Sequence, residues 1–212
     1  MEIIEEKAEV AWRKALRAVL NKGEDFIDRD NRLCREVINL QVTVKDVSSI
    51  AKPIEIINSF KKWVYPPIEE LKAVTLSRKE IPGYYYNYGA RSFNFEGVNQ
   101  VEDYIIPLLR KDKTSRRASI VFYNPVKDSS IFKKDVPGRM FTSFNIRKNK
   151  LHVINTIRSN DLFFGLPANL YQVFVLQEYV AKQIGCELGE ITTFSVSAHI
   201  FEDQFEHIRK LI

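Results

Sequence analysis

The sequence predicts a mixed α/β or α+β fold in a single domain that spans residues 1–212. The chain has 212 residues, of which 45% are hydrophobic and 12% aromatic, so it can bury one sizeable core. Segments with the spacing of amphipathic helices alternate with segments patterned like strands. No linker, internal repeat or low-complexity stretch separates these segments, which is why one domain is expected.

In the first half of the chain, residues 3–21 carry apolar side chains at near-helical spacing and stop at Gly23, which predicts an amphipathic helix. Residues 36–44 (EVINLQVTV) alternate well enough to predict a strand. A short helix is expected over residues 54–64, because one proline precedes it and two follow it. Residues 97–110 place their large apolar side chains on one helical face and predict a further helix.

In the second half, three strand-like runs occupy residues 118–123, 140–146 and 151–157. A polar Arg-Lys-Asn turn joins the last two runs into a predicted hairpin. Residues 170–185 are apolar nearly all round their centre, which is typical of a buried core helix. A last strand is expected over residues 191–200, followed by a polar terminal helix.

The positive charge of the chain is concentrated in one segment. The net charge is +5, but residues 111–150 hold eleven basic and three acidic side chains, so the remainder carries −3. A nucleic-acid-binding protein usually spreads its basic residues over a face or a helix, so nucleic acid is not an expected partner. The segment suits either a smaller anionic ligand or a short solvated stretch, and composition does not choose between them.

Several classes of protein are disfavoured. No run of about 18 apolar residues could span a membrane, and the acidic N-terminus (MEIIEEKAEV) does not resemble a signal peptide. Cys34 and Cys186 lie too far apart to form a CxxC metal pair, and three scattered histidines predict no metal site. We therefore expect a cytoplasmic protein with no membrane partner and no metal.

The segment from Arg158 to Asn169 (RSNDLFFGLPAN) is the most informative for chemistry. An arginine followed by a serine at a strand end can offer a forked guanidinium and a hydroxyl to one phosphate. Asn169 would enter the next helix with an amide that presents a donor and an acceptor to a base edge. Asp161 and Asn169 could instead cap the turn and the helix, and the residues alone leave both interpretations open.

This segment resembles the thymidylate synthase family, whose RSxDxxxGxPxN signature it matches without a gap. Three further segments are similar to family motifs in the same order: Tyr88-Gly89 followed by Arg91, the SRR strand and Asn-Pro end within residues 114–125, and the DxHxY-like strand at residues 197–201. The resemblance is good over residues 88–205 and loose over residues 25–55. It implies the family's fold, a large mixed sheet with helices on one face and the other face packed against a second subunit in a homodimer.

The resemblance also implies a pyrimidine nucleoside 5′-monophosphate as the ligand. Arg158 and Ser159 would hold its phosphate. Arg116 and Arg117 would reach across the homodimer to the partner's phosphate, which would account for part of the local positive charge.

Other residues inherit roles in the same way. Asn169 would read the pyrimidine ring, and an asparagine there fits the family's uracil binders. His199 would touch the ribose hydroxyl, and Asp161 lies where other members hold the folate ring. Arg29 is the expected counterpart of the N-terminal phosphate arginine, with Arg32 as a close competitor.

Glu55, Tyr88 and Arg139 are the candidate catalytic residues. Glu55 matches the family's general acid/base glutamate, or is a polar residue on a surface helix. Tyr88 takes its role from the Tyr-Gly motif. Counting back twenty residues from Arg158 reaches Gly138, where the family has the nucleophilic cysteine of a Pro-Cys-His motif. Arg139 then replaces the histidine, and could bind an anion, polarise a carbonyl or fill space.

The two cysteines of the chain are not expected to supply the missing nucleophile. Cys186 ends the buried helix, where a packed structural thiol is expected. Cys34 neighbours two arginines that would favour its thiolate and could approach the phosphate end, but nothing places it against the pyrimidine. Phe201 also replaces the family's ribose-binding tyrosine. The chain ends at Ile212 without the segment that closes over folate, so the cofactor is left open and folate is disfavoured.

Thymidylate synthesis requires a thiolate that adds to the pyrimidine ring, and glycine has no side chain to add. The hypothesis is therefore an enzyme that binds a nucleotide of the dUMP or UMP type and acts on it by other chemistry. Hydrolysis of the N-glycosidic bond, with Glu55 or Asp161 as general base, is one such reaction. The alternative is a catalytically inert relative that binds nucleotide as a sensor or assembly subunit.

Overall fold

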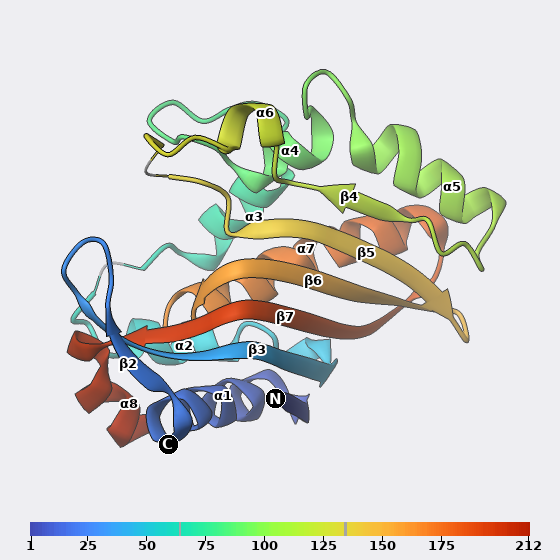
Figure 1. The fold of residues 1–212 in the computed structure, drawn as a ribbon. Helices are drawn as coiled ribbons and strands as arrows, with labels where there is room; N and C mark the ends of the chain where they lie inside the picture. Colours follow the sequence, from blue (N-terminus) through green and yellow to red (C-terminus); the bar gives the residue numbers. More distant parts are fainter. Residues whose placement is uncertain (64, 134) are drawn as a thin grey trace.

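The computed structural model describes residues 1–63, 65–133 and 135–212, and a seven-stranded sheet forms its centre (Figure 1). The strands are β1 (Glu2–Lys7), β2 (Glu24–Ile27), β3 (Leu33–Asp46), β4 (Ser119–Val121), β5 (Arg139–Arg147), β6 (Lys150–Asp161) and β7 (Glu187–Phe201). Their order across the sheet is β1-β3-β7-β6-β5-β4, and β2 pairs with β3. The β1–β3 and β6–β7 pairs are parallel and the others antiparallel, so the predicted mixed sheet is confirmed.

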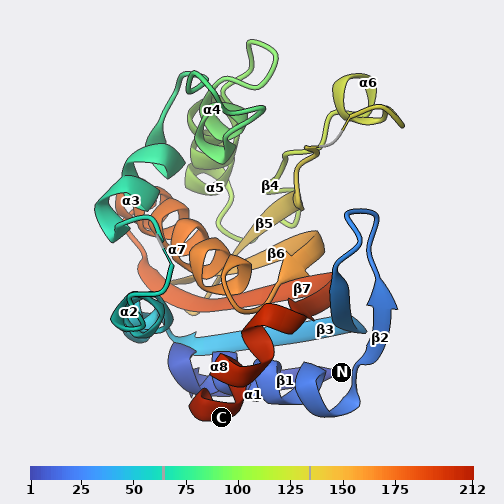
Figure 2. The ribbon, with the colours of Figure 1, turned by 90° about the vertical axis from the view of Figure 1, so that its left-hand side faces the viewer.

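Helices cover one face of the sheet and leave the other open (Figures 1 and 2). The helices are α1 (Ala8–Lys22), α2 (Lys52–Ser59), α3 (Ile68–Leu76), α4 (Tyr88–Phe93), α5 (Ile106–Lys111), α6 (Pro125–Asp128), α7 (Gly165–Ile184) and α8 (Phe205–Leu211). Short 3₁₀ turns span Val47–Ser49 and Glu202–Gln204, and a π-helical turn spans Gln100–Ile105. α7 lies across the covered face, with α1 toward the β1 edge and α3 packed on its outer side.

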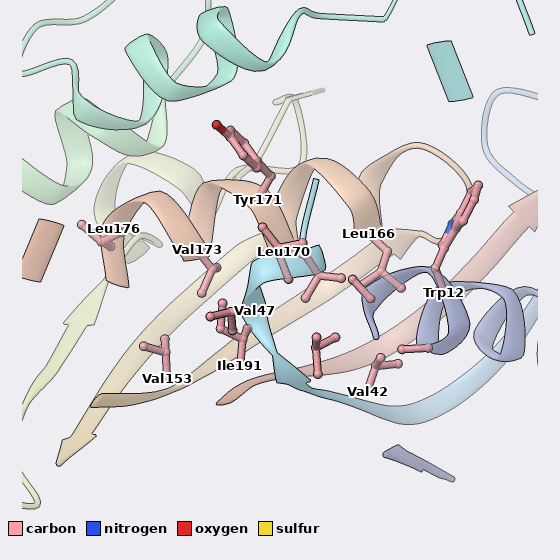
Figure 3. Packing of buried hydrophobic residues seen from close by; sticks show 14 of the residues in the cluster. Trp12, Val42, Val47, Val153, Leu166, Leu170, Tyr171, Val173, Leu176 and Ile191 are labelled. Atoms are coloured by element: carbon pink, nitrogen blue, oxygen red, sulfur yellow. The ribbon is translucent and has the colours of Figure 1, made fainter. Parts of the chain in front are cut away.

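α7 supplies the centre of the core. Its residues Leu166, Leu170 and Val173 point toward the sheet, where Val153 and Ile191 meet them (Figure 3). All five side chains are buried, and burying each contributes about 1.5–3 kcal/mol. The helix ends at Ile184 because Gly185 adopts φ 74°, the left-handed conformation of a helix C-terminal cap.

The predicted hairpin is confirmed. Arg147 of β5 pairs with Lys150 of β6, and the two residues between them form the turn. Lys148 and Asn149 adopt φ 49° and 60°, as a two-residue turn matched to the twist of the strands requires.

The prediction of one helix over residues 3–21 is wrong at its beginning. Residues Glu2–Lys7 form β1, which pairs in parallel with β3, and α1 begins at Ala8. Ile4 lies four residues before Ala8, a spacing that fits a continuous helix as well as a strand that leads into one. The edge-strand hydrogen bonds to β3 decide between the two.

Other elements differ from the prediction in their ends. β6 extends to Asp161 and α7 begins at Gly165, so the signature segment lies on a strand, a turn and the first turn of a helix. The helix predicted over residues 54–64 ends at Ser59, and its last predicted residue, Val64, lies outside the described residues. The helix predicted over residues 97–110 begins as the π-helical turn and continues as α5. The short elements β2, α3, α4 and α6 were not predicted.

Candidate functional site

A cleft of about 960 Å³ opens on the uncovered side of the sheet. One wall is the loop between β2 and β3, the floor is the ends of β6 and β7, and the opposite wall is the segment after α6. Figures 1 and 2 show the β2–β3 loop and the α6 segment rising on this same side. Five residues that the sequence singles out line the cleft: Arg29, Arg32, Arg158, Ser159 and His199.

Along β6 and β7 the alternation of buried and exposed side chains shifts by one residue. This shift turns Ser159 and His199 toward the cleft. The buried positions are odd-numbered up to Ile157 in β6 and Ser195 in β7, and even-numbered from Asn160 and Ala198 onward. A one-residue change of phase moves every following side chain to the other face of a sheet. Ser159, Ser197 and His199 therefore face the open side, although the sequence pattern earlier in each strand would turn them inward.

Arg158 forms the cationic centre of the cleft. Its Nε donates to the Pro137 carbonyl oxygen at 3.0 Å, and its Nη2 donates to the Val136 carbonyl oxygen at 2.8 Å. The Nη1 group has no hydrogen-bond partner within the described residues, and the side chain is exposed beside Ser159. This arrangement fixes the guanidinium and leaves donors for an anion.

Asp28 organises the β2–β3 loop that carries the other two arginines. Its Oδ1 accepts the amide hydrogens of Asp30 and Arg32, each at 2.9 Å. The amide of Arg32 holds the pKa of Asp28 below its usual range, and the Arg32 guanidinium also bonds to Asp28. Arg32 lies 4.2 Å over the ring of Phe201. Arg29, on the same loop, lies 3.9 Å from the Asp30 carboxylate and also lines the cleft.

A buried ion pair supports the wall opposite this loop. The Asp128 carboxylate accepts from both terminal nitrogens of Arg91 and from the Asn124 amide. Burial raises the pKa of Asp128, but the hydrogen bonds from Arg91 and Asn124 outweigh it and leave the pKa at about 2. Lys133 lies 3.3 Å from the same carboxylate and adds a cation to the cleft wall.

His199 lies on β7 next to two polar partners. It is paired with Glu36 in the β3–β7 register, and its Nδ1 is 3.4 Å from the Ser197 hydroxyl. The Ser197 hydroxyl is also hydrogen-bonded to Glu36. Burial lowers the pKa of His199, so the imidazole is neutral at pH 7.

Gly138, Tyr88 and Arg139 are brought together at one point. The Tyr88 hydroxyl accepts from the Arg139 amide at 3.0 Å, and the Arg139 guanidinium lies 4.3 Å over the Tyr88 ring. A Cβ atom at position 138 would lie 3.6 Å from the Tyr88 hydroxyl and 3.2 Å from the Ser159 carbonyl oxygen. The candidate reaction centre thus borders Ser159 through the backbone of that residue. Tyr86 packs on Tyr88 with ring centroids 5.5 Å apart.

Arg139 is a fully buried cation. Its Nη2 donates to Gln172 at 3.3 Å and to the Asn169 carbonyl oxygen at 3.4 Å, while its Nε has no partner within the described residues. No carboxylate among the described residues pairs with it, and burial lowers its pKa to about 10, which keeps it charged at pH 7. The rings of Tyr88 and Phe122 face the cation and offset part of the desolvation cost.

Asn169 and Asp161 lie beside the cleft rather than in it. The Asn169 amide donates to the Asn160 side chain at 3.2 Å. Asp161 lines a second groove of about 460 Å³, which shares Arg32 and Phe201 with the cleft. Burial raises the pKa of Asp161 to about 6, although the amides of the next two phenylalanines and the Gln204 side chain bond to the carboxylate.

Three predicted site residues lie elsewhere in this chain. Glu55 is exposed on α2, pairs with Lys52 at 3.0 Å and lines a separate hollow. Arg116 and Arg117 are exposed in the segment before β4 and do not line the cleft. The structure therefore does not bring Glu55 to the other candidates, and the action of the two arginines on a partner subunit stays a prediction.

Both cysteines are held as thiols. Cys34 lines the cleft, but burial raises its pKa to about 11, and its Sγ donates to the Arg32 carbonyl oxygen at 3.6 Å. The expectation that neighbouring arginines favour the Cys34 thiolate is therefore wrong. Arg32 does lower the pKa, but burial and Asp28 outweigh it. Burial also raises the pKa of Cys186.

Three basic residues of the segment 111–150 are paired or buried within the described part of the chain. Lys127 pairs with Glu96 at 2.7 Å, Lys133 lies against Asp128, and Arg139 is buried. The described residues contain no group of three His, Cys, Asp or Glu side chains that could hold a metal ion. No helix formed by them is long and apolar enough to cross a bilayer.

Sequence reasoning missed Glu36, Tyr86 and the pair of Arg91 and Asp128. Glu36 belongs to a predicted strand, yet its neighbours on β7 lie some 160 positions later in the chain, so no local signal links them. Tyr86 was one of several tyrosines in a run. Its position beside Tyr88 is the only signal that could have selected it.

The protein is therefore of the mixed α/β class. Helices cover one face of its sheet, and an arginine-lined cleft lies at the strand ends. Comparison with known proteins is consistent with it. The family model described as thymidylate synthase matches residues 58–212. A "Putative thymidylate synthase" of Methanococcoides burtonii is 34% identical over 203 residues, which cover 95% of this chain and 90% of the relative. Proteins with the same name from Methanosarcina barkeri and Methanothermobacter marburgensis are 32% and 30% identical, over 95% and 99% of this chain and 90% and 96% of theirs. The chain belongs to the thymidylate synthase family.

Proposed function

We propose that the chain binds a pyrimidine nucleoside 5′-monophosphate of the dUMP or UMP type in the cleft. The observation that carries this proposal is the convergence of Arg158, Ser159 and Arg29 on one open cleft beside His199. A fixed guanidinium with donors to spare, next to a hydroxyl, suits a phosphate dianion. Family membership supports the same ligand class, and Asn169 is the proposed reader of the pyrimidine ring.

Thermal unfolding with UMP, dUMP, CMP and dCMP tests the proposal. At a concentration one hundred times the dissociation constant, a bound nucleotide adds about 2.7 kcal/mol of stability. A preference for uracil nucleotides supports the role of Asn169. If none of the four nucleotides shifts the transition, the proposal fails.

We further propose that any turnover avoids a cysteine nucleophile, because position 138 is glycine and Cys34 is a thiol at neutral pH. Hydrolysis of the N-glycosidic bond is one such reaction, with Asp161 reaching the sugar from the second groove, which shares Arg32 and Phe201 with the cleft. Asp161 would accept a proton from water, the oxygen of that water would attack C1′, and the C1′–N1 bond would break with its electrons going to the pyrimidine. The pyrimidine anion would then take up the proton held by Asp161, which restores the carboxylate. The products would be the free base and a sugar 5-phosphate, separable by mass spectrometry.

An inert nucleotide binder is the second candidate function. It is favoured by the position of Glu55, which is exposed and paired with Lys52 outside the cleft. Binding with an unchanged nucleotide mass after prolonged incubation would select this function over hydrolysis.

We expect that Gly138→Cys creates a thiol that bound nucleotide protects. The added Cβ would be 3.2 Å from the Ser159 carbonyl oxygen, a tight contact that a shift of a few tenths of an ångström relieves. With nucleotide at ten times its dissociation constant, alkylation should slow about elevenfold, because only the free protein reacts. Thr114→Cys, on an exposed loop, is the matched control and should react at one rate throughout. Equal alkylation of the Gly138→Cys protein with and without nucleotide would show that the bound nucleotide does not cover position 138.

We also propose that the open face of the sheet packs against the same face of a second copy. Large apolar side chains on five strands remain exposed there: Ile4 (47%), Val121 (49%), Phe141 (40%), Ile154 (42%) and Val196 (44%). Several exposed apolar side chains on one face of a sheet are typical of a protein interface. The second copy would also bring its exposed Arg116 and Arg117 toward the cleft, which one chain alone does not do.

Phe141→Asp is expected to convert the protein to a monomer. Phe141 pairs with Val121 on β4 and Thr156 on β6, so its side chain lies within the apolar face. A buried, unpaired carboxylate in an interface is strongly unfavourable. Size-exclusion chromatography with light scattering measures the mass. Lys72→Asp, on exposed α3, should keep the dimer mass, and a wild-type protein that is already monomeric at micromolar concentration would contradict the proposal.

A further inference from the structure

Glu36 lies in the cleft without a role in phosphate binding. The β3–β7 register places it opposite His199, and its Oε1 accepts a hydrogen bond from the Ser197 hydroxyl. That hydroxyl also lies 3.4 Å from the His199 imidazole. The three side chains form one connected cluster at the floor of the cleft, which we call the Glu36 cluster.

The Glu36 carboxylate retains acceptor capacity. Among the described residues it forms no ion pair, and its Oε2 has no hydrogen-bond partner. A carboxylate is only an acceptor, so it needs donors such as hydroxyl groups. The neighbouring imidazole is neutral at pH 7, because burial lowers the pKa of His199. The acceptor oxygens of Glu36, beside the Ser197 hydroxyl and the His199 imidazole, therefore suit a ligand group with several O–H donors and not a phosphate.

The cluster lies at a suitable distance from the phosphate residues. Ser197 pairs with Ser159 in the β6–β7 register, and His199 follows two positions later on the same strand. Two residues of a strand span about 6.6 Å. The 5′-phosphate of a nucleotide and the hydroxyl edge of its ribose are separated by a comparable span. A phosphate at Ser159 thus brings the sugar hydroxyls to Glu36 and His199.

Phe201 stands where the family has a ribose-binding tyrosine, so sugar recognition in this chain is expected to differ from that of the family. Its ring carries no hydroxyl and is covered by the Arg32 guanidinium at 4.2 Å. Phe201 therefore offers a sugar no hydrogen bond, and Glu36 on the neighbouring strand β3 is an additional acceptor at the floor of the cleft.

We propose that the Glu36 cluster selects ribonucleotides over deoxyribonucleotides, with the Glu36 carboxylate accepting hydrogen bonds from the ribose 2′- and 3′-hydroxyls. This inference rests on the proposed nucleotide function and narrows its ligand to the UMP class. Acidic side chains recognise ribose hydroxyls in dinucleotide-binding folds by the same chemistry. A site that hydrogen-bonds a hydroxyl discriminates strongly against the analogue without it, because its polar groups are then left unpaired.

The test is calorimetric titration of the full chain with UMP and dUMP, for wild type, Glu36→Gln and Glu36→Ala. Wild type should bind UMP about tenfold or more tightly than dUMP, as expected for one hydrogen bond to a charged acceptor. The ratio should fall in Glu36→Gln, which keeps one acceptor oxygen, and approach one in Glu36→Ala. The ratio is taken within each variant, so a general loss of stability cancels. Glu178→Gln, on the exposed side of α7, is the matched control and should keep the wild-type ratio.

Three other outcomes would each contradict a different part of the proposal. Equal or tighter binding of dUMP by wild type would overturn ribose selection and leave nucleotide binding intact. A wild-type preference for UMP that survives in Glu36→Ala would overturn the role of Glu36. No binding of either nucleotide by wild type would remove the proposed function itself, and the inference with it.

Discussion

Replacing Arg158 with alanine is expected to weaken nucleoside monophosphate binding by about 30-fold to several thousandfold. Truncating one partner of a hydrogen-bonded charge pair costs about 2–5 kcal/mol, and each 1.4 kcal/mol is tenfold in affinity. The guanidinium is fixed by the carbonyl oxygens of Val136 and Pro137 while its Nη1 stays available to a ligand. Calorimetric titration of the variant with UMP measures the loss.

Two controls separate ligand binding from local structure. Arg158→Lys keeps the charge but loses the fork, so it should bind between wild type and alanine. Arg147→Ala removes an exposed arginine at the far end of β5 and should bind as wild type does. If Arg158→Ala binds nucleotide with unchanged affinity, the phosphate does not occupy this part of the cleft.

The parts of the site that could be predicted from the sequence are those carried by contiguous residues. Arg158 and Ser159 are adjacent, and their strand leads directly through a turn into α7, so their common direction follows from local order. The same continuity allowed the buried helix α7 and the β5–β6 hairpin to be predicted, whereas the mixed sheet was predicted from the family resemblance. In a long helix or strand, the spacing of the hydrophobic residues indicates which face is buried.

The remainder depends on contacts that local order does not record. Glu36 meets Ser197 and His199 only because β3 pairs with β7. The buried pair of Arg91 and Asp128 joins residues 37 positions apart across α4 and α6. Neither contact has a periodicity that could reveal it, and both follow from the order of elements in the finished fold.

The one-residue shift of alternation in β6 and β7 explains why the direction of the Ser159 side chain does not follow from the strand pattern. Alternation read from Leu151 to Ile157 would turn Ser159 into the core, whereas the change of phase after Ile157 turns it to the cleft. β1 and β2 escaped prediction for a related reason. They are edge strands with exposed residues, so pairing with β3 stabilises them without a strong hydrophobic pattern.

Asp161→Asn is expected to stabilise the protein at alkaline pH by about 1–3 kcal/mol. Burial raises the pKa of Asp161 from 3.8 to about 6. At about 1.4 kcal/mol per pKa unit, ionising this carboxyl in the folded protein costs about 3 kcal/mol. Asparagine carries no charge and keeps an oxygen for the Phe163 and Phe164 amides, but its amide meets the Gln204 amide, which reduces the gain.

The sign of the pH dependence follows from the raised pKa. The folded protein binds the Asp161 proton more tightly than the unfolded chain does. The stabilisation is therefore complete below about pH 3.8 and lost as the pH rises through about 6. Unfolding temperatures of wild type and Asp161→Asn should diverge between about pH 4 and pH 7, whereas Asp103→Asn, on the exposed π-helical turn, should follow wild type. Parallel curves for wild type and Asp161→Asn would mean that the carboxylate is well solvated.

The same variant separates stability from chemistry. If Asp161 is the base that accepts a proton from water, Asp161→Asn loses hydrolysis while it gains stability at pH 8. A merely structural carboxylate would leave turnover unchanged. The wild-type rate should rise with the ionised fraction of Asp161 around pH 6, because only the ionised form accepts a proton. An Asp161→Asn protein that is more stable but has no turnover would therefore assign the Asp161 carboxylate to the reaction. Without such a role, ionisation of this buried carboxyl would only destabilise the fold.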